Sequence, residues 1–186
     1  MKEVSLMKNK RFLYVSIVLI LSLALAACGS SQKKEEAGQE VGVANPWSDV
    51  GSAEEAAKGA GIDSFTVPEG AEISLGTVNV ETYRCMEGLA EVHFPIAAVE
   101  MTIRKGLGSL AEKGDVSGDY ENYKNEWKSD IDGIEVTCYG NREGEATKTL
   151  WNAGDYCYSV VALGAGGDSD FGLSPEDLAI IVSGTK

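Results

Sequence analysis

The chain of 186 residues carries 16 Lys and Arg against 29 Asp and Glu, with a single His, and its formal net charge is −13. A surface this acidic repels the phosphates of nucleic acids and of anionic lipid headgroups, so we do not expect nucleic acid as a partner.

A basic and then apolar segment comes first in the chain. Basic residues at positions 8, 10 and 11 precede the apolar run 12–27, which is shorter than the roughly 20 residues of a comfortable membrane span. This order is typical of an export signal, not of a transmembrane helix. Translation could start at Met1 or at Met7, because the basic region is complete in both cases.

The apolar run ends in Leu25-Ala26-Ala27-Cys28. This ending resembles the lipobox of bacterial lipoprotein signal peptides, in which the Cys is lipidated and becomes the first residue of the mature protein. The resemblance implies residues 1–27 as signal peptide and an extracytoplasmic protein anchored in the membrane by lipid on Cys28. The alternative is an ordinary secretory signal cut at small residues, and the Cys directly after Leu-Ala-Ala argues against it.

Residues 28–42 are predicted to be a flexible tether, because Ser, Gln, Lys, Glu and Gly dominate them and large apolar side chains are nearly absent. Removal of residues 1–27 takes away four basic and one acidic residue, which leaves 12 Lys and Arg against 28 Asp and Glu and a net charge of about −16. Residues 43–186 are enough for one domain with a hydrophobic core.

The first predicted helix starts after Ser52 and covers Ala53 to about Lys58. Ser52 and Glu55 have the spacing of a capping box, and Gly59 and Gly61 provide the stop. Upstream, Trp47 has two interpretations, an exposed ring for ligand stacking or an anchor for the segment. Anchoring is favoured because buried area dominates the energetics of aromatic side chains.

From 73 to 103 apolar residues alternate with polar or small ones, which predicts half-buried antiparallel strands. Pro95 must lie at a bulge, an edge or a turn, because it cannot donate to a ladder. His93 shares the polar parity with Glu91, and we interpret it as a solvated strand residue, since no nucleophile or metal site can be placed beside it.

Residues 106–119 are predicted to form a loop, and residues 120–163 are predicted to form an antiparallel meander. Asp132-Gly133 suits a two-residue type I′ turn, which pairs Ile131 with Ile134 and places Trp127 opposite Cys138. A second turn at Ala153-Gly154 would pair Asn152 with Asp155, Trp151 with Tyr156 and Thr149 with Tyr158, and one register of the preceding loop sets Trp151 opposite Ile134. One face then collects Trp127, Ile134, Val136, Trp151, Tyr156, Tyr158 and Val160.

The aromatic part of this face is the candidate binding site, with Trp127, Trp151, Tyr156 and Tyr158 lining a ligand groove. The alternative, which we favour, is that a helix packs over these side chains.

Three cysteines follow Cys28, at Cys85, Cys138 and Cys157, so at most one intramolecular disulfide can form among them. The meander separates Cys138 from Cys157 by about 9.6 Å, or two strand spacings, beyond the roughly 7 Å that a disulfide tolerates. A disulfide would therefore involve Cys85, and three buried thiols are the favoured alternative.

The Gly-rich segment 164–172 contains Asp168 and Asp170, two weak candidates for cation ligands that lack the full pattern of a calcium loop. The last helix begins with Ser174 as N-cap and Pro175 at its first position. Its apolar stripe consists of Leu178, Ile181 and Val182.

Several short motifs are similar to the uncharacterised domain-of-unknown-function family 4367. They are Asn45-Pro46-Trp47 with 52–56, Val67-Pro68, 151–159 and 173–178. The resemblance would span roughly residues 43–185. It implies a sheet with helices in a lipoprotein or membrane-tethered protein of a Gram-positive-type bacterium, in a sensing or binding role, and it brings no catalytic residues.

We therefore expect an α+β domain whose single curved antiparallel sheet of about six strands carries the N- and C-terminal helices on one face. The predicted function is a lipid-anchored, extracytoplasmic, non-catalytic module that binds a protein, peptide or small solute, without a cofactor. The alternatives are a calcium-binding protein and a secreted hydrolase. The sequence contains no Gly-x-Ser-x-Gly or His-Glu-x-x-His signature, which argues against the hydrolase.

Overall fold

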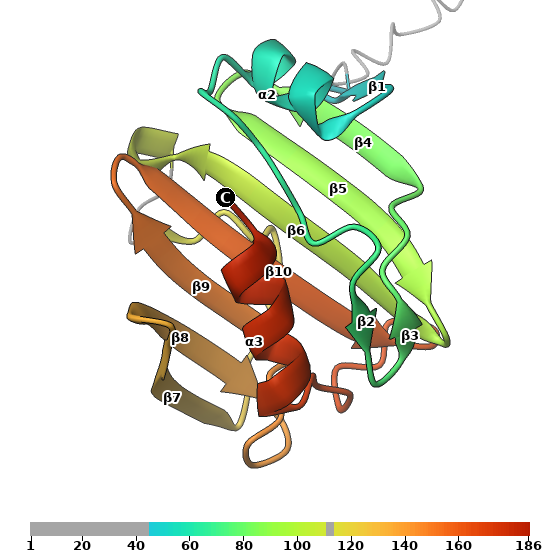
Figure 1. Cartoon of the computed structure of the whole chain (residues 1–186). Coiled ribbons are helices and arrows are strands. Elements are labelled where there is room, and N and C mark those ends of the chain that lie inside the picture. The colour runs from blue at the N-terminus through green and yellow to red at the C-terminus, as the bar shows by residue number, and fades with distance from the viewer. Residues whose placement is uncertain (1–44, 111–113) are drawn as a thin grey trace, which may run out of the picture. The chain divides into compact units, whose positions relative to one another are not determined.

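The strands in the described part of the chain, residues 45–110 and 114–186 of a computed structural model, form an eight-stranded antiparallel sheet and a separate two-stranded hairpin (Figure 1). The order in the large sheet is β1-β4-β5-β6-β10-β9-β8-β7. Its strands are β1 (Ser48–Val50), β4 (Thr82–Met86), β5 (Leu89–Ile96), β6 (Val99–Leu107), β7 (Asn125–Ile131), β8 (Ile134–Gly140), β9 (Lys148–Ala153) and β10 (Tyr156–Gly164). The small hairpin pairs β2 (Glu72–Ile73) with β3 (Gly76–Thr77).

The strands confirm a mostly antiparallel sheet with helices, but the expected single sheet of about six strands is wrong, because the main sheet has eight strands and a second sheet has two. Strand β1 has three residues, two of them exposed, so it carries no alternating pattern that the sequence could reveal. Strand β7, at the opposite edge, is exposed at most of its positions but was predicted as the first strand of the meander. Edge strands bury little apolar surface, which weakens the signal from which strands are predicted.

The two central strands, β6 and β10, are far apart in the sequence. A connection from Gly108 onward, which includes a short 3-10 helix (Gly108–Leu110), leads to the far edge of the sheet, and the meander β7-β8-β9-β10 returns to β6. The predicted Asp132-Gly133 turn is confirmed, since both residues have positive φ, 53° and 83°.

The register of the meander agrees with the prediction only in its first hairpin. Ile131 pairs with Ile134 and Trp127 with Cys138, as expected. In the third and fourth strands Tyr158, not Tyr156, lies opposite Trp151, and Trp151 pairs with Val136, not with Ile134. Both errors are shifts of two residues, so the predicted side chains still share one face.

Helix α2 (Ala53–Ala60) extends two residues beyond the expected end. Ser52 Oγ accepts a hydrogen bond from the Glu55 N–H, while the Glu55 carboxylate reaches back to the N–H of Gly51. Gly61 ends the helix in the left-handed conformation, with φ 71°. Gly59 lies inside the helix and packs on Cys85, where a Cβ would collide with the sulfur.

Helix α3 (Pro175–Gly184) lies on the face of the sheet against which α2 also packs. It has the predicted cap, in which Ser174 Oγ accepts from the Asp177 N–H. The Asp177 carboxylate accepts from the N–H and hydroxyl of Ser74, and this ties the β2-β3 hairpin to the helix.

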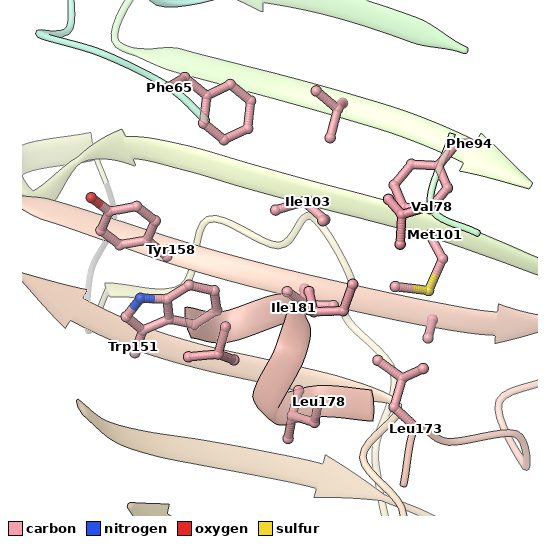
Figure 2. Close-up of a cluster of buried hydrophobic side chains, with 14 of the residues drawn as sticks. Phe65, Val78, Phe94, Met101, Ile103, Trp151, Tyr158, Leu173, Leu178 and Ile181 are labelled. Atoms are coloured by element: carbon pink, nitrogen blue, oxygen red, sulfur yellow. The ribbon is translucent and has the colours of Figure 1, made fainter. Parts of the chain in front are cut away.

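The core lies between the helices and this face (Figure 2). Side chains of both helices belong to one buried cluster with those of β5, β6, β9 and β10, which confirms that N- and C-terminal helices cover one face. Its fully buried large members include Phe94, Met101, Ile103, Ile181 and Leu173.

The opposite face of the sheet contains a buried charge cluster. Glu91 is fully buried there and accepts hydrogen bonds from Nε of both Arg84 and Arg104. The Trp47 ring lies against both guanidinium groups, at 4.8 and 5.4 Å. Trp47 is therefore placed as an anchor of its segment, the favoured interpretation, and Glu91 does not lie on a solvated face as the sequence pattern suggested.

Farther along this face, the segment after Gly114 covers a second buried charge. Lys148 is 6% exposed and lies 3.4 Å from the Asp115 carboxylate and close to the rings of Tyr123 and Tyr139.

Pro95 lies near the end of β5, where the pairing of β5 with β4 has already ended at His93. Its missing N–H therefore leaves no gap in that ladder. None of the described helices is long and apolar enough to cross a membrane.

Candidate binding cleft

A cleft of about 310 Å³ opens between the edge strand β7 and the N-terminal half of α3. Its apolar walls come from Trp127 and Ile131 on the strand and from Pro175, Leu178 and Ala179 on the helix. Asp130 and Asp132 line it as well, and the Cys138 thiol lies among its lining residues. We call this site the β7–α3 cleft.

The cleft exists because α3 contacts the edge strand β7 but covers only part of it. Trp127, Ser129 and Ile131 share the parity that faces the core on β7. Ile131 is buried, but Trp127 is half-buried and Ser129 is exposed. On the helix, Pro175 is also exposed. The last strand on this side therefore presents core-type positions that the helix leaves open.

Contacts from two loops hold the ends of the cleft. At one end Ser183 Oγ donates to Asp132 Oδ2 at 2.6 Å, which joins the end of α3 to the turn between β7 and β8. At the other end, Ala146 and Leu173 exchange two backbone hydrogen bonds of 2.9 Å. The helix is thus held at a set distance from β7.

The rim of the cleft is acidic. Asp132 lines it, and Gly144, which also lines it, lies between Glu143 and Glu145 in the sequence. Asp130 lines it too, but its side chain has the opposite parity on β7. The nearby cations already have acidic partners, because Lys128 lies 2.7 Å from Glu135, and Arg142 lies 3.4 Å from Glu145. A positively charged ligand would therefore be attracted to this rim.

The Cys138 side chain is not suited to nucleophilic chemistry. Burial raises the pKa of its thiol, and a weak hydrogen bond from Thr149 lowers the pKa by less. The protonated thiol is a poor nucleophile, so Cys138 contributes apolar surface to the floor of the cleft. Cys85 and Cys157 are buried free thiols too, as the favoured alternative expected.

The backbone of β7 adds a second feature to the site. Ile131 and Ile134 flank a two-residue turn, so they form a hydrogen-bonded pair, and such pairs then alternate along the hairpin. The N–H and C=O groups of Glu126, Lys128 and Asp130 consequently point away from β8. Within the described part of the chain these backbone groups have no hydrogen-bond partner.

The four candidate residues of the predicted aromatic groove lie in different environments. Trp151 and Tyr158 are 3% and 5% exposed and stack on each other in the core, with ring centroids 5.1 Å apart (Figure 2). Tyr156 is half-buried near Lys105, and its hydroxyl accepts from the Asp63 N–H. Only Trp127 lines the β7–α3 cleft among these four. The helix residues of the cleft, Pro175 and Ala179, were not anticipated.

The other candidate residues are not gathered into a site. Asp168 Oδ1 accepts from the Asp170 N–H at 2.9 Å, a local turn contact. Among the described residues, no group of three or more His, Cys, Asp or Glu side chains is placed to hold a metal ion. His93 pairs with Glu100 at 3.1 Å on a partly exposed strand position. Cys28, together with the predicted signal peptide and the predicted tether, lies outside the described residues.

Comparison of the chain with protein-family models, with curated proteins and with solved structures finds no match.

Proposed function

We propose that this protein is a lipid-anchored, extracytoplasmic, non-catalytic binding or sensing module, and that the β7–α3 cleft is its binding site. The observation that carries the proposal is the half-buried Trp127 in an apolar cleft, directly beside a strand edge whose backbone groups have no partner in the described part of the chain. Aromatic side chains that are apolar in body and partly exposed are typical anchors of binding surfaces.

The membrane part of the proposal is supported by the sequence. The basic and apolar start of the chain and the ending Leu25-Ala26-Ala27-Cys28 are those of a lipoprotein signal. Stable attachment needs two or more acyl chains, and lipidation of a lipobox Cys would supply them.

Site-specific photo-crosslinking in cells tests the binding role. A photoreactive amino acid in place of Ser129, which is exposed on the cleft side of β7, should crosslink to a defined partner in the membrane fraction. The matched control carries the same amino acid in place of Tyr120, which is 92% exposed and lies outside the cleft. Identical crosslinking patterns from the two positions would refute binding in the cleft.

A further inference from the structure

We infer that the ligand of the β7–α3 cleft is an extended, basic polypeptide segment that pairs antiparallel with β7 as an additional strand and places apolar side chains against Trp127. This inference rests on the proposed function and specifies the chemistry of the ligand at that same site.

The two edges of the sheet differ in how they are protected. Strand β1 has only three residues, and short edge strands resist pairing with another chain. Strand β7 has seven residues, contains no Pro and pairs with β8 without a bulge. The outward groups of Glu126, Lys128 and Asp130 could form up to about six backbone hydrogen bonds with an antiparallel strand.

The side chains of such a strand would divide into two sets. Residues directly opposite each other in an antiparallel pair have side chains on the same face. One set would therefore lie beside Trp127, Ser129 and Ile131 and point toward the cleft. The other set would lie beside Glu126, Lys128 and Asp130 on the opposite face. A volume of about 310 Å³ suits a few apolar side chains, since it is at the lower end for small-molecule pockets.

Charge selects a basic partner. The second set of side chains faces two carboxylates, Glu126 and Asp130, while Lys128 is paired with Glu135. The cleft rim adds Asp132, and the whole chain has a net charge of −13. Charges of opposite sign directly across two strands attract, and like charges repel. A second copy of this chain would bring a second acidic edge to the first, so we favour a different, basic polypeptide.

The phase of the hydrogen bonds makes the inference testable at single amides. In the antiparallel arrangement, the residues of the partner whose side chains face Glu126 and Asp130 are the ones whose N–H groups point at β7. In a heptapeptide of alternating Lys and Val, with Val toward the cleft, these are the Lys residues. N-methylation of the Lys amides should remove the hydrogen bonds, and N-methylation of the Val amides should not.

The experiment uses the full lipidated chain in nanodiscs of zwitterionic lipid and the acetylated, amidated Lys/Val heptapeptide with a fluorescent label. Fluorescence anisotropy should show binding that weakens about tenfold or more when Glu replaces Lys in the peptide, and that also weakens as salt screens the charges. The Lys-methylated peptide should lose binding and the Val-methylated peptide should retain it. Equal affinities of the two methylated peptides, or loss of binding by the Val-methylated peptide alone, would overturn the proposed pairing.

Two variants localise the binding to β7. Lys128→Pro removes one outward N–H and leaves the ladder to β8, so it should weaken peptide binding. The matched control Lys128→Ala keeps the N–H and removes a cation beside the peptide's lysines, so it should bind at least as tightly as the parent does. Circular dichroism checks that both remain folded. Crosslinking at Ser129 without any binding of the Lys/Val peptide would reject the extended basic ligand and keep the binding role. Peptide-induced dimers, or binding that Lys128→Pro leaves unchanged, would also reject it.

Discussion

Removal of the buried negative charge of Glu91 should destabilise this protein strongly. Its side chain is fully buried, and both oxygens accept from arginines whose side chains are 34% exposed at Arg84 and 15% exposed at Arg104. The substitution Glu91→Gln keeps the volume but removes the negative charge. The two guanidinium groups then face each other without a counterion, and the new amide N–H groups meet other donors.

The expected loss can be estimated from these exposures. Breaking a buried ion pair by removal of one partner costs about 3–5 kcal/mol. We expect about 3 kcal/mol, the lower end, because Arg84 keeps contact with water. For a domain of this size that corresponds to a decrease of about 10 °C in Tm. Urea unfolding measures the loss in the free energy of unfolding, and thermal scans measure the decrease in Tm. Tryptophan fluorescence can follow both transitions, because the ring of Trp47 lies on the two arginines.

An exposed ion pair provides the control. Glu135→Gln disrupts the pair with Lys128, whose two side chains are 70% and 66% exposed, and should change Tm by no more than about 2 °C. Adding Arg104→Met to Glu91→Gln should recover part of the loss, because it removes one of the two unpaired cations. If Glu91→Gln were as mild as Glu135→Gln, the proposed role of the buried carboxylate would be refuted.

Three further predictions concern the anchor, the thiols and a turn. Cys28→Ala should shift the protein from the membrane pellet to the soluble fraction or leave it unprocessed, and full retention of a correctly cleaved chain would contradict the lipid anchor. Burial raises the pKa of the Cys138 and Cys157 thiols, and Cys85 is buried as well. A thiol reagent at pH 8 should therefore modify all three far more slowly in the native protein than in urea. Rapid labelling of the native protein would show that the structure around these thiols opens. Gly133→Ala should destabilise the protein by about 1 kcal/mol in urea unfolding, because φ there is 83°, and a neutral result would mean that the turn relaxes.

Much of the fold could be predicted because the signals are local. The caps at Ser52 and Ser174 depend on residues three positions away, and the turn at Asp132-Gly133 depends on two residues. The shared face of Trp127, Trp151 and Tyr158 depends only on strand parity and on turns. A register error of two residues does not disturb that parity, which is why the face was correct although the pairing of Trp151 was not.

The site was harder to predict because it depends on what covers each position. Trp127 and Trp151 have the same parity, yet Trp151 is 3% exposed in the core whereas Trp127 stays half-buried beside the cleft. Helix contacts such as that of Ser183 with Asp132 join segments 51 residues apart. No local pattern in the sequence encodes the distance between a helix and the edge of a sheet.

By itself, the sequence determined the acidic charge, the helix caps and the parity of the strands, because each depends on composition or on neighbours along the chain. Only the tertiary structure decided that β6 lies beside β10, that Glu91 is buried between two arginines, and that β7 is an edge strand next to α3 within the described part of the chain. These features depend on contacts between distant segments, in which burial, and not residue type, sets the role of a side chain.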